Sequence, residues 1–157
     1  MPATFEYSES NTAIETVTDA ISNLNFGSID SPNLVTTTYP ITAGLNSFSK
    51  YIRVKFSGSF TTISNMLFWM SIGTLVTDET IKAGANVAFA TPSQTATGDS
   101  GVPTTEGSAL AIQASNGSST IVAPGYTKYI RLQTQTSTST PSGAVNQKTF
   151  TFQYDEV

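Results

Sequence analysis

The chain has 157 residues and a net charge of -4, from seven Lys and Arg against eleven Asp and Glu. Charged residues make up only 11 % of the sequence, against about 25 % in an average soluble domain. In their place stand 20 Ser and 26 Thr, and there is no His and no Cys. These counts exclude a Ser-His-Asp triad, a thiolate nucleophile and a zinc–thiolate site, and the absence of basic clusters argues against binding to nucleic acid.

The first twenty residues fit two interpretations. Ile14, Val17 and Ile21 are spaced as on one face of a helix, but the β-branched residues around them lower helix propensity. We therefore favour an extended N-terminal arm or edge strand over residues 1–20, followed by a β-sandwich domain over residues 21–157. No basic and apolar leader pattern and no stretch long enough for a membrane helix is visible, so we expect no secretion signal and no membrane partner.

Alternating apolar and polar residues then predict strands. The clearest is 50–56, where Ile52 and Val54 share one face while Tyr51 and Arg53 share the other. The segments 129–135 and 149–154 repeat this alternation, and further strands are expected at 23–28, 34–39, 63–71, 80–89 and 108–113.

The segment 63–71 differs because Met66 to Met70 are apolar without alternation. This pattern indicates a central strand covered on both faces, or one whose outer face meets a partner. Trp69 within it suits a core position better than a sugar-binding platform. Seven or eight strands separated by turn residues predict an all-β fold, an antiparallel two-sheet β-sandwich of jelly-roll or Ig-like type with the extended N-terminal arm.

Two long loops and one repeated motif complete the pattern. The loops 91–105 and 134–147 are rich in Pro, Gly and hydroxyls, and are either functional or flexible hairpin tips. Lys50-Tyr-Ile-Arg-Val54 and Lys128-Tyr-Ile-Arg-Leu132 are nearly identical. They indicate equivalent strands in two halves of the sandwich, unless Lys-Tyr-Ile-Arg is simply a good strand sequence. Asn116-Gly117 predicts a tight turn.

The candidate catalytic groups are few. Asp78-Glu79 and Asp155-Glu156 are adjacent carboxylates, and neighbours on a strand point to opposite faces, so neither pair forms an acid–base couple. Gly98-Asp99-Ser100-Gly101 resembles a serine-nucleophile motif, but there is no His to act as base, and Asp99 alone is weak evidence for a calcium site. We expect no enzyme activity, no catalytic residue, no cofactor and no metal site.

The outward faces of the two repeated motifs offer a binding surface instead. Tyr and Arg are the residues that most often anchor protein contacts. Tyr51, Arg53, Tyr129 and Arg131 are therefore the predicted interface residues.

Several segments, taken in order, resemble small β-sandwich virion proteins of tailed bacteriophages. These segments are NLNFGS at 23–28, PITAG at 40–44, KYIR at 50–53, ISNMLFW at 63–69 and TFTFQYDE at 149–156. The resemblance implies a structural virion protein, most simply a capsid decoration (cement) protein on the phage head, or a component of the neck, tail or fibre.

From this resemblance we expect a homo-oligomer whose partners are the major capsid protein or other virion proteins. It would be located in the virion after assembly in the host cytoplasm. The alternative is a tail- or fibre-associated module that binds a receptor or glycan through an exposed aromatic platform. Trp69, Tyr39 and Tyr126 are the candidates for such a platform.

Overall fold

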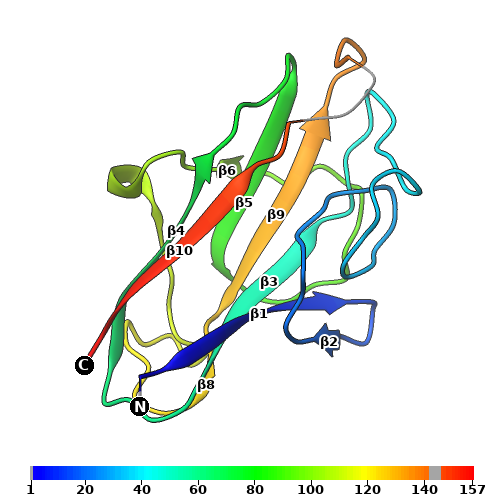
Figure 1. Cartoon of the computed structure of the whole chain (residues 1–157). Helices are drawn as coiled ribbons and strands as arrows, with labels where there is room; N and C mark the ends of the chain where they lie inside the picture. The colour runs from blue at the N-terminus through cyan, green and yellow to red at the C-terminus, as the bar shows by residue number, and fades with distance from the viewer. Residues whose placement is uncertain (1, 142–145) are drawn as a thin grey trace.

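The computed structural model describes residues 2–141 and 146–157, which form two antiparallel β-sheets (Figure 1). In chain order the elements are β1 (Thr4–Asn11), β2 (Thr16–Thr18), β3 (Lys50–Ser57), β4 (Ile63–Ile72), β5 (Glu79–Val87), β6 (Ser100–Gly101), the 3-10 turn η1 (Glu106–Ser108), β7 (Leu110–Ala111), β8 (Gly125–Tyr126), β9 (Tyr129–Thr136) and β10 (Thr149–Glu156). The predicted two-sheet β-sandwich is confirmed.

The two sheets differ in size. The large sheet has the order β2-β1-β3-β9-β5-β6, with β8 paired to β3, and the small sheet has the order β10-β4-β7. Apolar side chains from the facing sides fill the space between them, as the alternation predicted: Ile52, Val54, Ile130 and Leu132 are all buried. Aromatic rings pack between the two sheets: the ring centroid of Phe56 in the large sheet lies 5.0 Å from that of Tyr154 in the small sheet.

The strands expected at 50–56, 63–71, 80–89, 129–135 and 149–154 are confirmed as β3, β4, β5, β9 and β10. The segment 108–113 contributes only the two-residue β7. β4 is the central strand of the small sheet, with Met66, Phe68 and Met70 buried in the core. Its other face is only partly covered, since Trp69 is buried but Leu67 is half-buried and Ser71 is exposed.

Two strand predictions were wrong. Residues 23–28 and 34–39 lie in the long connection between β2 and β3 and form no strand. They bury apolar side chains without pairing: Leu34 is buried, and a Cβ on Gly27 would lie 2.6 Å from its side chain. Hydrogen bonds from the amides of Thr38 and Tyr39 to the carbonyl of Val35 close a turn within the second segment.

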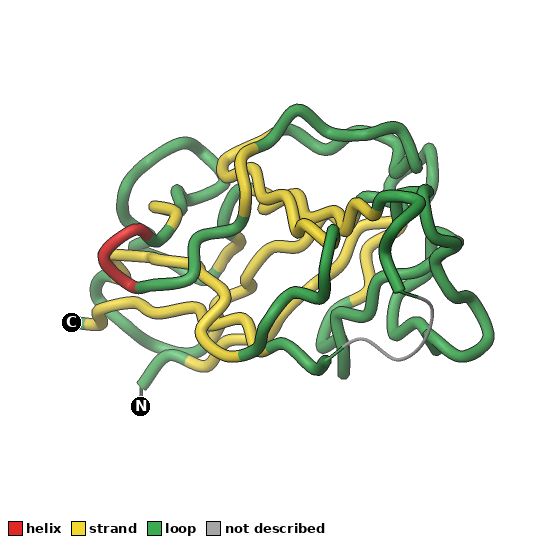
Figure 2. The backbone as a smooth tube through the Cα atoms, turned by 90° about the horizontal axis from the view of Figure 1, so that it is seen from above, coloured by secondary structure: helices red, strands yellow, loops and turns green. Residues whose placement is uncertain are grey.

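The N-terminal residues are extended and paired. β1 lies antiparallel to β3 over Thr4 to Ser10, and β2 folds back along β1. Residues 4–18, expected as an arm or an edge strand, thus complete one side of the large sheet. The N- and C-termini meet at one end of the sandwich, where the backbone amide of Ala3 donates to the Glu156 carboxylate (Figure 1). Figure 2 shows many of the loops gathered away from the termini.

Tyr7 of β1 makes stability depend on alkaline pH. Burial raises the pKa of its phenol to about 12, and the nearby backbone N–H of Phe152 only partly opposes this. Because the folded-state pKa is the higher one, its contribution to stability is complete below pH 10 and is lost as pH rises toward 12. Between pH 9 and about pH 12, the unfolding free energy of Tyr7→Phe should therefore fall by roughly 2–3 kcal/mol less than that of the wild type. Urea unfolding over this pH range measures the difference.

The matched control is Tyr39→Phe, because the Tyr39 side chain is exposed. This control should follow the wild-type curve over the same pH range. An unchanged alkaline slope in Tyr7→Phe would contradict the assignment to Tyr7.

Candidate functional site

The two Lys-Tyr-Ile-Arg motifs pair with each other. They lie side by side in one sheet, with Tyr51 of β3 opposite Arg131 of β9, and not in two halves of the sandwich as predicted. Antiparallel pairing of two identical alternations places Tyr beside Arg on the outer side of the sheet. The structure therefore brings together all four predicted interface residues, and we call Tyr51, Arg53, Tyr126, Tyr129 and Arg131 the Tyr–Arg face.

Aromatic and guanidinium groups alternate across this face. The Arg53 guanidinium carbon lies 4.0 Å from the ring centroid of Tyr126 and 4.8 Å from that of Tyr129. The ring of Tyr51 meets Tyr129 edge-on at 6.2 Å. Such cation–π contacts contribute about 0.5–2 kcal/mol each. Tyr126 was proposed only for the alternative glycan platform, and its place here follows from the pairing of β8 with β3.

The loop after β5 covers one side of the face. Asp99 receives two hydrogen bonds of 2.7 Å from the Arg131 guanidinium, and Phe89 packs at 5.2 Å against Tyr51. This ion pair lowers the pKa of Asp99 and raises that of Arg131. The predicted loop 91–105 thus contacts the sheet through Asp99, and its residues Ser100 and Gly101 form the short strand β6 that pairs with β5. Part of the other predicted loop, residues 142–145, lies outside the described residues.

Gly84 of β5 makes room for this ion pair. A Cβ at Gly84 would lie 2.5 Å from Oδ1 of Asp99, closer than real Cβ contacts come. The register shift in β5 falls between Ala85 and Val87, so Gly84 does not mark a bulge. The glycine is instead required because the carboxylate lies directly over the backbone.

We expect Gly84→Ala to displace Asp99 from Arg131 and to cost about 1–3 kcal/mol of unfolding free energy, since it disrupts two charge-assisted hydrogen bonds. Asp99→Asn should reduce the unfolding free energy by less than Gly84→Ala does. It should also weaken the dependence of stability on pH in the acid range. The folded-state pKa of Asp99 is lowered, so the pair stabilises above about pH 4 and is lost as pH falls through the folded-state value.

The measurement is urea unfolding at pH 7 and at pH 3. Gly98→Ala is the matched control, because a Cβ there would meet no atom within 4 Å. Equal losses for Gly84→Ala and Gly98→Ala would refute the close approach.

The hairpin between β1 and β2 covers the other side of the face. Glu15 accepts hydrogen bonds from the hydroxyls of Tyr129 and Ser10 and lies 4.0 Å from Arg53. Asp19 accepts hydrogen bonds from Lys55, Ser8 and Tyr126. The Lys55 hydrogen bond is the main cause of a lowered pKa at Asp19. Thr12 and Glu15 hold positive φ angles of 65° and 52° in this turn.

The Tyr–Arg face is therefore largely engaged within the chain. Tyr51 is only 3 % exposed and, in this conformation, offers no surface to a partner. Arg53, Tyr129 and Arg131 are half-buried, and each faces a carboxylate of the same chain. Their role at an interface stays a prediction. The local alternation placed them on one face, but it contains no signal for the hairpin and the loop that cover that face.

The remaining candidate carboxylates make structural contacts. Glu79 is buried in a two-pronged ion pair with Lys148, whose Nζ lies 2.9 Å from both oxygens. Asp155 accepts from the Asn65 amide, and Glu156 accepts from the amide of Ala3. Within residues 2–141 and 146–157, no three Asp or Glu side chains gather as metal ligands. Among the same described residues, no helix is long and apolar enough to cross a membrane.

A second candidate surface was missed by the sequence reasoning. The loops at the end opposite the termini are joined by hydrogen bonds, for example from Thr136 to the carbonyl of Leu45 and from Thr140 to that of Asp78. Leu45, Ile72 and Leu75 are exposed there, by 52 %, 66 % and 38 %. We call these three side chains the distal surface. The connections at this end also carry exposed hydroxyls, from Thr42, Thr74, Thr77, Thr138 and Ser139.

Comparisons of the chain with protein-family models, with curated proteins and with solved structures gave no match.

Proposed function

We propose that this chain is a structural virion protein of a tailed bacteriophage, most simply a capsid decoration protein that binds the major capsid protein on the head lattice. The ordered motifs that resemble small virion proteins support the proposal. The composition supports it as well, because a chain with 11 % charged residues limits repulsion between many copies packed side by side.

The observation that carries the proposal is the distal surface. Ile72 ends β4, Leu75 lies in the connection from β4 to β5, and Leu45 lies in the connection before β3. Hydrogen bonds to Thr136 and to Thr74 hold these two connections to neighbouring segments. Exposed aliphatic side chains in connections rich in uncharged hydroxyls suit a contact that excludes water and desolvates little charge. Both termini lie at the other end, so they leave this end free for a lattice (Figure 1).

The experiment is binding of the purified chain to capsids assembled without it, followed by sedimentation and by the heat resistance of the capsids. We expect saturable binding and a higher disruption temperature, and light scattering should report an oligomer. The double variant Leu45→Ser/Ile72→Ser should bind at least about tenfold more weakly, which corresponds to about 1.4 kcal/mol.

The matched control is Val122→Ser, which removes an equally exposed aliphatic side chain outside the distal surface. This variant should bind like the wild type. Absence of wild-type binding would refute the decoration role. Unchanged binding by the double variant would refute the distal surface as the contact.

The alternative glycan-binding function loses most of its candidate platform. Trp69 is only 9 % exposed, and Tyr126 lies beneath Arg53. Tyr39 alone among the three candidates is exposed. No specific observation favours this alternative.

A further inference from the structure

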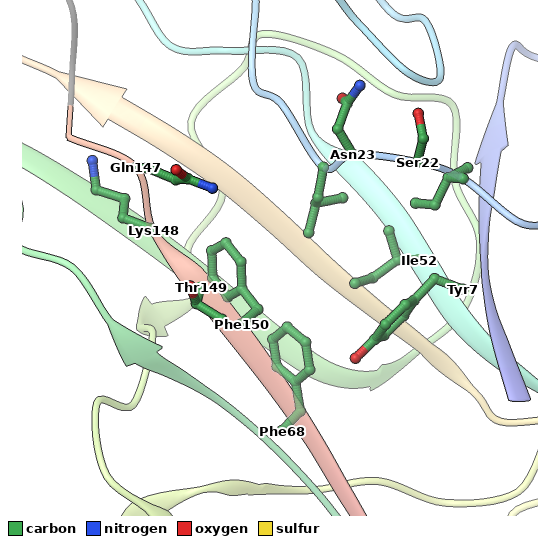
Figure 3. Close-up of a pocket in the computed structure, with 11 residues that line it drawn as sticks. Tyr7, Ser22, Asn23, Ile52, Phe68, Gln147, Lys148, Thr149 and Phe150 are labelled. Carbon is green, nitrogen blue, oxygen red and sulfur yellow. The ribbon is translucent and has the colours of Figure 1, made fainter.

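The sandwich is open along one side, where a cavity of about 270 Å³ lies between the two sheets. Its walls come from both layers: Tyr7 and Ile52 from the large sheet, Phe68 and Phe150 from the small sheet, and Ile21 and Leu24 from the connection after β2 (Figure 3). The walls are therefore mostly aromatic and aliphatic. Surfaces of this kind favour an apolar occupant over water.

Each wall of the cavity has contacts of its own. The backbone amide of Ile21 donates to the carbonyl of Tyr7 at 3.1 Å. The Asn33 amide oxygen accepts from the backbone amide of Ser22 at 2.6 Å and from its hydroxyl at 3.0 Å. Opposite them, the rings of Phe68 and Phe150 are stacked at 5.6 Å. Because these contacts already fix the walls, little binding free energy would be lost in ordering them around a ligand.

The rim is polar, and none of the described residues that line it carries an unpaired charge. Ser22, Asn23 and Gln147 supply hydroxyl and amide groups at the mouth. Lys148 also lines it, but its ammonium is bound by both oxygens of Glu79, so the pair is neutral. An anionic ligand would find no free cation at this mouth, whereas a neutral group able to hydrogen-bond would suit the rim.

The volume limits the size of the ligand. A dry apolar cavity of about 150 Å³ holds a benzene ring, so about 270 Å³ suits a compound of two fused rings. We propose that this cavity is a binding site for a small neutral aromatic compound. Its rings would lie against Phe150, Ile21 and Leu24, which keep accessible surface, and a hydrogen-bonding group would lie at the Asn23 and Gln147 rim. This inference does not depend on the proposed virion role.

The test is a titration of the full-length, ¹⁵N-labelled chain with indole, followed by NMR. A ligand of this size is expected to bind with a dissociation constant of roughly 0.1–1 mM. We expect saturable shifts at the amides of Asn23, Thr149 and Phe150, and none at Arg53 or Arg131. No saturable shift by about 5 mM indole, or shifts centred elsewhere, would overturn the proposal.

Two comparisons sharpen this test. Leu24→Trp should fill part of the cavity and weaken indole binding at least about tenfold, whereas Ile14→Trp, at a position 90 % exposed, should not. Indole-3-carboxylate should bind at least about tenfold more weakly than indole, because its charge finds no cation. Equal binding by the carboxylate, or by a folded Leu24→Trp variant, would contradict the site. If Leu24→Trp does not fold, the wild-type shifts and the carboxylate decide the question.

Discussion

Lys50→Met is expected to destabilise the chain by about 3–5 kcal/mol, because it leaves a buried carboxylate without its cation. The Lys50 ammonium lies 2.7 Å from Glu9, and the two residues are 3 % and 0 % exposed. Lys50 also donates to the carbonyl of Ser31, and Asn11 donates to Glu9. Without the ammonium, the donor from Asn11 alone would compensate the charge.

The double variant Lys50→Met/Glu9→Met should recover most of this loss, since it removes both charges and keeps similar volumes. Lys55→Met is the matched control, because the ion pairs of Lys55 are about one-third exposed and should therefore contribute much less than the buried pair. The measurement is urea unfolding at pH 7. A loss for Lys50→Met no larger than that of the control would contradict the buried pair, as would a double variant worse than the single one.

Gln133→Leu is expected to cost about 3 kcal/mol or more, since it leaves several buried backbone groups unpaired. Gln133 is fully buried, and its amide nitrogen donates to the carbonyls of Ser47 and Thr95, each at 3.0 Å. Its amide oxygen accepts from the backbone amide of Thr97 at 2.9 Å. One side chain therefore holds the loop after β5 against the chain that leads into β3.

The prediction has a local and a global measurement. Urea unfolding gives the lost free energy, and amide hydrogen exchange at Thr97 should accelerate even where the rest of the sheet stays protected. Gln153→Leu is the matched control, because Gln153 donates only to Glu106 on the surface, and its cost should stay within about 0.5 kcal/mol. Slow exchange at Thr97 in a folded Gln133→Leu variant would show that the loop is held by other contacts.

The sequence predicted well those strands in which apolar and polar residues alternate regularly, so that the inward-facing positions are unambiguous. Ile52, Val54 and Phe56 point into the core because successive side chains on a strand point to opposite faces. The segments 23–28 and 34–39 have similar composition, but their backbone groups turn back on nearby carbonyls or side chains. Local composition does not distinguish pairing with a distant strand from such local bonds, so those two predictions were wrong.

The candidate site was predictable only in part. Alternation placed Tyr51, Arg53, Tyr129 and Arg131 on outward faces, and they do share one face of the large sheet. That β3 and β9 are neighbours was not predictable, because 78 positions separate the two motifs and no local pattern encodes that contact. The distal surface was missed for the same reason: Leu45 precedes β3 and Ile72 ends β4, and no local pattern shows that both segments lie at the end of the sandwich opposite the termini.

By itself, the sequence determined which chemical groups are available and which residues of each strand share a face. A chain without His or Cys has no thiolate and no imidazole in any fold, and a period of two assigns each strand residue to one of two faces. Only the tertiary structure decided which outward faces stay open. Asp99, Glu15 and Gln133 close the outer face of the large sheet through ion pairs and hydrogen bonds to distant segments. Such contacts have no period in the sequence, because they depend on which loops the fold brings over that face.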